Sequence, residues 1–159
     1  METDKFTNTH LLPSTVIDSY WLYEADKLKD SNNNIGKWML FYPKNEMNNN
    51  WKLAKKLYNE NALNGVVSMK CSTNKKNKNA TNDNGIIIFY CSDSNNWRKI
   101  NMIGKNIIDK MNYTNSQYLY YKTDAQTQAG AYQANGKTKN YKYYIKNHLL
   151  KPEFELMDD

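Results

Sequence analysis

The clearest pattern of apolar and polar positions lies in the middle of the chain. Residues 63–92 hold two apolar segments, LNGVVSMKCST and GIIIFYCS, separated by the polar loop NKKNKNATNDN. Successive side chains of a strand point to opposite faces. The first segment therefore places Val67, Met69 and Cys71 on one face and Lys70 on the other. The pattern predicts a long β-hairpin with one apolar face and a cation on its opposite face.

Four further segments are dense in aromatic residues and other residues typical of strands. They are residues 19–24 (SYWLYE), 36–42 (GKWMLFY), 117–123 (QYLYYKT) and 140–146 (NYKYYIK). In the last of these, alternation predicts that Tyr141, Tyr143 and Ile145 share one face. Together with the hairpin, these segments predict a sheet of about six strands.

Two segments carry apolar residues at the three- and four-residue spacing of a helix. The first is a predicted helix over residues 46–61, capped by Asn45, with an apolar stripe of Met47, Trp51, Ala54, Leu57 and Tyr58. The second follows a cap at Ser92 or Ser94 and carries the stripe Trp97, Ile100, Gly104, Ile107, Ile108 and Met111. Because Trp38, Trp51 and Trp97 lie on apolar stripes, we expect all three in the core.

The order of these elements is strand, strand, helix, hairpin, helix, strand, strand. Such an order predicts an α+β fold, in which two helices pack on one face of an antiparallel sheet and leave the other face partly open for a ligand. We expect an N-terminal arm over residues 1–18, a single domain over 19–147 and an acidic tail over 148–159.

Length and cysteine use point to one self-sufficient domain. At 159 residues the chain is long enough to bury a substantial core. Cys71 and Cys91 lie at nearly paired positions of the hairpin, where a disulfide is geometrically feasible, but no secretion signal precedes them and buried free thiols are the expectation. With no apolar run of membrane-spanning length, we expect a cytoplasmic or nuclear protein without membrane contact.

The charge balance is moderately basic. There are 22 Lys and Arg against 16 Asp and Glu, which gives a formal net charge of +6. This charge suits nucleic acid or an acidic protein surface, although a lysine- and asparagine-rich proteome produces the same bias. Arg98 is the single arginine. Since readers of duplex base edges are usually arginine-rich, sequence-specific duplex binding is disfavoured.

Catalytic chemistry has little support in the sequence. His10 and His148 are the only histidines and show no metal-ligand spacing, so no metal site is expected. Carboxylates at the ends of predicted strands, Glu24, Asp26 and Asp124, are more typical of solvated or capping residues than of an acid–base pair. No phosphate-cradling glycine loop is present. We therefore predict a binding protein, not an enzyme, that needs no cofactor.

Several short motifs in their order along the chain resemble one protein family. They are Tyr20–Tyr23 (YWLY), Gly36–Leu40 (GKWML), Trp51, Leu63–Lys70 (LNGVVSMK), Tyr121–Asp124 (YKTD) and Gly136–Lys139 (GKTK). The chain resembles the basophilic-leukaemia-expressed protein family, which has the fold of the cap-binding translation initiation factor 4E. The resemblance implies a curved antiparallel sheet backed by helices, with a nucleotide- or RNA-binding concave face.

Lys70 and Lys75 match the basic positions that contact the cap phosphates in these cap-binding relatives. Two tryptophans hold the methylated base there. One precedes the region of resemblance, and the other would fall within residues 26–36, which contain no tryptophan. Trp21, with Glu24 as the acid, is the available substitute. The resemblance thus implies phosphate binding without ordinary cap recognition, and it supplies no helix for docking the initiation scaffold protein.

The last two predicted strands interleave tyrosines with lysines, a composition that suits single-stranded RNA or a protein interface. As a phosphate-binding set we take Lys70, Lys75, Lys122 and Lys142, and as base-stacking residues Trp21 and Tyr120. The leading hypothesis is a non-enzymatic protein that binds RNA or a nucleotide phosphate on its concave face. The alternative is a structural or adaptor subunit of a larger assembly that has lost its ligand, and protein partners are expected in either case.

Overall fold

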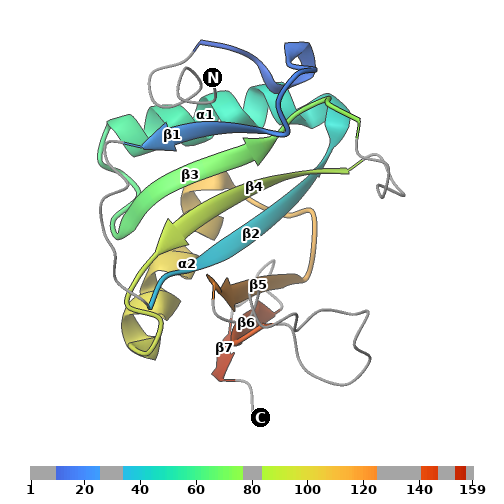
Figure 1. The fold of residues 1–159 in the computed structure, drawn as a ribbon. Helices are drawn as coiled ribbons and strands as arrows, with labels where there is room; N and C mark the ends of the chain where they lie inside the picture. The colour runs from blue at the N-terminus through green and yellow to red at the C-terminus, as the bar shows by residue number, and fades with distance from the viewer. Residues whose placement is uncertain (1–9, 26–33, 77–83, 125–140, 147–152, 157–159) are drawn as a thin grey trace.

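One curved antiparallel sheet backed by two helices forms the fold, as the sequence predicts (Figure 1). The computed structural model describes residues 10–25, 34–76, 84–124, 141–146 and 153–156. The strands are β1 (Trp21–Ala25), β2 (Gly36–Pro43), β3 (Val66–Ser72), β4 (Asn84–Cys91), β5 (Tyr118–Thr123), β6 (Tyr143–Lys146) and β7 (Glu153–Leu156). The helices are α1 (Met47–Asn59) and α2 (Trp97–Met111), with single 3-10 turns η2 (Pro13–Thr15) and η3 (Lys44–Glu46).

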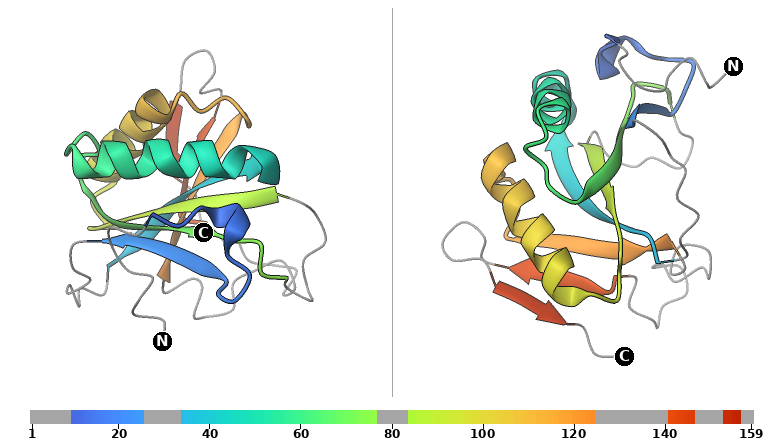
Figure 2. Two further views of the ribbon diagram at one scale, coloured as in Figure 1. Left: turned by 90° about the horizontal axis from the view of Figure 1, so that it is seen from above. Right: turned by 90° about the vertical axis from the view of Figure 1, so that its left-hand side faces the viewer.

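In the described part of the chain the sheet has seven strands, in the order β1-β3-β4-β2-β5-β6-β7. Both helices lie on the same face of it (Figure 2). The sequence analysis expects no strand beyond residue 146, yet β7 pairs antiparallel with β6, with Phe154 opposite Ile145. Its four residues, EFEL, alternate, but so short a run in an acidic segment is identified as a strand only by its pairing.

The predicted hairpin is confirmed, because β3 and β4 pair antiparallel with Lys70 opposite Ile88. A bulge between Val66 and Ser68 interrupts the register. Bulges insert an extra residue and disturb the alternation of faces. As a result Val67 is 37% exposed and Val66 is buried, so the assignment of Val67 to the apolar face was wrong.

The register also explains why the two cysteines are not bonded. Cys71 stands opposite Ile87, and Cys91 stands opposite Val66. Both are buried free thiols, as expected, and burial raises the pKa of each.

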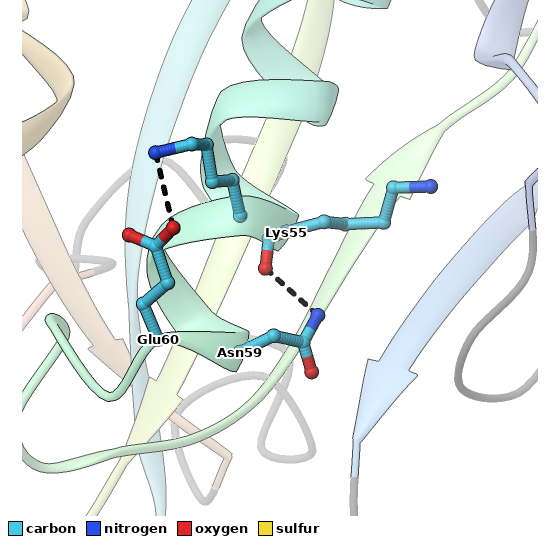
Figure 3. Close-up of polar contacts among 4 residues, drawn as sticks. Lys55, Asn59 and Glu60 are labelled. Carbon is cyan, nitrogen blue, oxygen red and sulfur yellow. Dashed lines mark hydrogen bonds and ion pairs between the residues drawn. The ribbon is translucent and has the colours of Figure 1, made fainter.

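Helix α1 buries Met47, Trp51 and Ala54, the first part of its predicted stripe. Its predicted cap, Asn45, is wrong: the 3-10 turn η3 precedes the helix, and the N-cap is Glu46, whose side chain makes no capping bond. At the other end, the side-chain amide of Asn59 donates a hydrogen bond to the Lys55 carbonyl (2.8 Å), as Figure 3 shows. In the same figure, the Lys56 ammonium forms an ion pair with the Glu60 carboxylate (3.0 Å). These contacts close the last turn of the helix.

Helix α2 begins later than predicted, because Asn96 is its N-cap. The Asn96 side chain accepts a hydrogen bond from the Lys99 amide (3.2 Å). The prediction that Trp97 lies in the core was wrong. Its side chain is 41% exposed, and the Arg98 guanidinium lies 4.8 Å from its ring. It is the first residue of α2, one turn before Ile100, where the sheet-facing stripe becomes buried.

Trp38 of β2 joins the sheet to α2. It is fully buried, its Nε1 donates to the Ile100 carbonyl (3.1 Å), and its ring meets Tyr121 edge-on at 5.3 Å. The helix approaches closely here because it presents Gly104: a Cβ at that position would lie 2.7 Å from the Trp38 ring. This packing fixes which face of β2 is covered and leaves Lys37 on the other.

Candidate functional site

The open face of the sheet is defined by the register of its strands. One row of opposed residues crosses six described strands, and a second row runs parallel to it. The first is Tyr23, Lys70, Ile88, Met39, Tyr120 and Tyr144, and the second includes Tyr90, Lys37 and Lys122. Their neighbours along each strand, such as Trp38 and Leu40, are buried under the helices. Lysines and aromatic residues therefore share the face that α1 and α2 leave open.

Lys70 lies among three aromatic rings. Its Nζ is 4.0 Å from the centroid of Trp21, 5.8 Å from Tyr90 and 5.9 Å from Tyr23. A cation within about 6 Å of a ring face is attracted by the ring quadrupole. We call Trp21, Tyr23 and Tyr90 the aromatic cage, and its cation position is filled by a side chain of the protein itself.

Two more lysines share this face with Lys70. Lys37 acts on Lys70 and stands opposite Lys122, and we call Lys37, Lys70 and Lys122 the lysine cluster. Lys37 of β2 stands opposite Lys122 of β5, and the Lys37 Nζ is 6.0 Å from the Tyr90 ring. The charge of Lys37 acts on Lys70, and that of Lys122 acts on Lys37. Among the described residues, Asp124 is the acid whose charge acts on both Lys37 and Lys70. The cluster thus keeps a net positive charge.

Partial burial changes the acid–base properties of the cluster. Burial, reinforced by the neighbouring Lys37 charge and opposed by Asp124, lowers the pKa of Lys70 to about 8. Burial also lowers the pKa of Lys37, with Asp124 acting against it and Lys122 with it. Both shifts arise because an ammonium group loses hydration when it is covered. An anion that binds on this face would compensate the lysine ammonium groups for their lost hydration and would stabilise their charged form.

The predicted phosphate-binding set is divided by the structure. Lys70 and Lys122 lie in the lysine cluster, whereas Lys75 follows the end of β3 and its Nζ lies 4.9 Å from the Tyr20 ring. Lys142 precedes β6, with its Nζ 5.5 Å from the ring of buried Tyr143. The cluster is therefore built from Lys70, Lys122 and a residue that the sequence reasoning did not select, Lys37.

Trp21 lies beside Lys70 as the base-stacking hypothesis requires, but Glu24 is not available as its acid. Glu24 is 2% exposed on the helix-facing side of β1, where it accepts a hydrogen bond from the Asn59 amide (2.9 Å). Alternation along a five-residue strand places positions 21 and 24 on opposite faces. The pairing of Trp21 with Glu24 was wrong for this reason, and Asp26 lies outside the described residues.

Tyr120, the second predicted stacking residue, lies in a group of open-face tyrosines. We call Tyr118, Tyr120, Tyr141 and Tyr144 the tyrosine cluster. The Tyr141 ring is 4.6 Å from that of Tyr120. The prediction that Tyr141 shares the face of Tyr143 was wrong, because β6 begins only at Tyr143 and the alternation does not reach back to Tyr141.

Three residues of the site escaped the sequence reasoning although a signal existed. Lys37 precedes Trp38 in a strand whose side chains alternate between faces. Its position on the open face could therefore be predicted once Trp38 was assigned to the core. Tyr23 and Tyr90 could be assigned to the site only after the register had placed Tyr23 opposite Lys70 and Tyr90 on the neighbouring strand near it. The cage thus depends on register, which single segments do not contain.

The described residues include no group of three or more His, Cys, Asp and Glu side chains arranged to hold a metal ion. Within the same part of the chain, neither the length nor the apolarity of any helix suffices to span a membrane.

Comparison with protein families decides the relationship that the fold and the motifs suggest. The family model described as "Basophilic leukemia-expressed protein Bles03" matches residues 26–130, more than half of the chain. The chain belongs to the Bles03 family. A comparison with curated protein sequences finds no significant match for this Bles03-family chain.

Solved structures of translation initiation factor 4E share the fold. Schistosome eIF4E complexed with m7GpppA and 4E-BP has a TM-score of 0.61 and 14% identity, over 86% of this chain and 76% of that one. C. elegans eIF4E-3 with the 4E-binding protein Mextli and a cap analog has a TM-score of 0.59 and 11% identity, over 76% and 72%. Ascaris suum eIF4E-3 with m7G cap has a TM-score of 0.54 and 11% identity, over 72% and 68%. At these identities the likeness establishes the fold of the Bles03-family chain.

Proposed function

We propose that this protein binds the phosphate groups of RNA or of a nucleotide on its open face, and that it acts by binding and not by catalysis. The supporting observation is the lysine cluster: Lys37, Lys70 and Lys122 come from three different strands and share one face, with Lys37 between the other two and Asp124 as the nearby acid. Several like charges, partly buried together, favour an anionic ligand whose charge compensates for the hydration that they have lost. Members of the same fold are seen with cap ligands.

The aromatic cage argues for phosphate and against a cationic methylated base as the preferred ligand. The Lys70 ammonium already lies 4.0 Å from the Trp21 ring. A methylated guanine that stacked on this side of the ring would bring a second positive charge beside the first. Ordinary cap recognition is therefore disfavoured here, whereas a phosphate would contact the ammonium and leave the cage intact.

Binding of a short single-stranded RNA should depend on the lysine cluster. Each of Lys70→Gln and Lys37→Gln is expected to weaken binding roughly tenfold or more, because each removes a charge-assisted contact worth about 1.5–3 kcal/mol. The measurement is fluorescence anisotropy of a labelled oligonucleotide at several salt concentrations. Lys52→Gln, at an exposed position of α1, is the matched control and should bind like the parent protein. Equal affinity in all four proteins would exclude the lysine cluster as the site.

The same binding should weaken at a pH where ordinary lysines remain charged. The pKa of Lys70 is lowered to about 8, so its charge is present below pH 8 and is lost as pH rises through that value. Affinity for a phosphodiester strand, whose own charge is constant, should fall between about pH 7 and 9, well before the usual lysine range near 10.4. In Lys70→Arg the guanidinium stays protonated, and this fall should disappear. An unchanged pH profile in Lys70→Arg would assign the titration to another group.

A protein-binding role is the second candidate. The described part of the N-terminal segment exposes three large apolar or aromatic side chains that a partner could cover, Leu11 (40%), Ile17 (72%) and Tyr20 (45%). Two of the similar structures are complexes with 4E-BP and with the 4E-binding protein Mextli. Absent or salt-independent RNA binding, together with purification of the chain in a stoichiometric complex, would favour this adaptor role over the phosphate-binding one.

A further inference from the structure

The tyrosine cluster forms a nearly continuous aromatic surface at the β5–β6 end of the open face. The rings of Tyr118 and Tyr120 are parallel, with an interplanar angle of 7° and a centroid distance of 5.9 Å. Tyr141 lies 4.6 Å from Tyr120, and Tyr144 lies 5.9 Å from Tyr118. Four phenol rings from two adjacent strands and the residues before β6 thus pack against one another on the face away from the helices.

These rings differ from the tyrosines that the fold uses for packing. On the helix-facing side, Tyr121 and Tyr143 are buried, and their hydroxyls donate to the carbonyls of Cys91 (2.9 Å) and Ser94 (2.6 Å). By contrast, Tyr118 is 41% exposed, and the other three members of the cluster are partly exposed. Packing of the core does not account for the tyrosine cluster, because the core lies between the sheet and the helices and the cluster lies on the opposite face of the sheet.

The cluster adjoins the lysine cluster directly. Tyr120 is two residues from Lys122 on the same face of β5, and Lys146 stands opposite Tyr118 in the register of β5 and β6. Across the sheet, Lys70 and Tyr120 belong to one row, separated by three strand spacings. At about 4.8 Å per spacing they are roughly 14 Å apart. At a stacked rise of about 3.4 Å per nucleotide, that separation corresponds to about four nucleotides.

We propose that the tyrosine cluster is a base-stacking subsite that continues from the lysine cluster, so that the ligand is a single-stranded nucleic acid of about four nucleotides or more. This inference rests on the proposed function, since the lysine cluster holds the backbone of the same strand. Aromatic faces accept any base, and adjacent lysines follow the phosphates, which is the combination that single-strand binding requires. A proline-rich peptide would also use tyrosine faces, but it carries no charge that would use the lysines.

The test compares oligonucleotides of one to eight nucleotides, each made with bases and as an abasic strand of equal charge. In the parent protein, affinity should rise with length up to about four nucleotides and should be higher for strands with bases. Tyr118→Leu and Tyr120→Leu should each weaken binding of the strands with bases roughly 5- to 150-fold, leaving abasic strands and the salt dependence unchanged. Tyr20→Leu, an exposed tyrosine outside the cluster, is the matched control. Thermal unfolding midpoints close to that of the parent protein establish that the variants fold.

The outcomes separate this inference from the proposed function. If no oligonucleotide binds, with bases or abasic, then the lysine cluster is not a phosphate site, and the proposed subsite is excluded with it. Tight binding that is equal for abasic strands, or insensitive to Tyr118→Leu and Tyr120→Leu, would overturn the subsite alone. Binding of a proline-rich peptide that is lost in the same two variants, without nucleic-acid binding, would assign the cluster to a protein ligand instead. RNA and DNA oligonucleotides of the same sequence distinguish the two kinds of nucleic acid. Tighter binding of RNA would indicate a contact with the 2′-hydroxyl, and equal binding would indicate recognition of phosphates and bases alone.

Discussion

Replacing Trp38 with alanine is expected to lower the free energy of unfolding by about 3–5 kcal/mol, because a fully buried indole leaves a cavity that its neighbours fill only in part. The change also removes the hydrogen bond from Nε1 to the Ile100 carbonyl and the edge contact with Tyr121. For a domain with a total stability of about 5–15 kcal/mol, this is a large share. Urea denaturation followed by far-ultraviolet circular dichroism measures it.

Trp97→Ala is the matched control, since it makes the same chemical change in a tryptophan that is 41% exposed. Its effect should stay within about 1 kcal/mol, because little apolar area is lost and exposed substitutions are usually mild. Comparable losses at the two positions would show that α2 does not pack on β2 through Trp38. The pair is informative because both tryptophans lie on apolar stripes in the sequence and only the fold distinguishes them.

Replacing Lys70 with alanine is expected to change the ligand preference of the aromatic cage in two opposite directions. Removal of the ammonium weakens phosphate binding and at the same time frees the face of Trp21, which Tyr23 and Tyr90 flank. A cation on such a surface gains about 0.5–2 kcal/mol. The nucleoside 7-methylguanosine, which has a cationic base and no phosphate, should therefore bind Lys70→Ala about 2- to 30-fold more tightly than it binds the parent protein. Isothermal titration calorimetry measures the affinity of 7-methylguanosine for each of the two proteins, with guanosine as the neutral reference.

Lys70→Arg separates the loss of the amine from the loss of the charge. A guanidinium still covers the cage, so this variant should gain no affinity for 7-methylguanosine. A parent protein that already preferred 7-methylguanosine to guanosine would contradict the argument, because it would mean that Lys70 leaves the ring when a cationic base arrives. The proposed phosphate site would then have to be tested with Lys37 and Lys122 alone.

The faces of individual strands were predictable where the segment was regular. In β3, Lys70 lies on the face opposite Met69 and Cys71, as the period of 2 predicts, and the buried stripes of α1 and α2 follow from the period of 3.6 residues. The same reasoning failed where a local feature broke the period: the bulge beside Val67, the late start of α2 before Trp97, and the start of β6 after Tyr141. Each failure lies at an end or an irregularity, where pairing across the sheet overrides the pattern of a single segment.

The candidate site was predictable only in part. Lys70 and Trp21 could be selected because each lies in a short motif with a clear alternation, and Lys122 because it interleaves with tyrosines. Lys37 had a readable face but no reason to be singled out until β2 was known to lie between β4 and β5. Glu24 was assigned to Trp21 by nearness in sequence, although the two side chains point to opposite faces of β1.

By itself, the sequence determined that this chain makes a hairpin-centred antiparallel sheet with two amphipathic helices on one side, because the spacing of apolar residues is a local property of the chain. Only the tertiary structure decided that Lys70 would fill a cage of Trp21, Tyr23 and Tyr90 and that Lys37 would stand opposite Lys122. Those neighbours come from strands far apart in the sequence. The order and register of the strands that bring them together depend on the packing of the whole sheet.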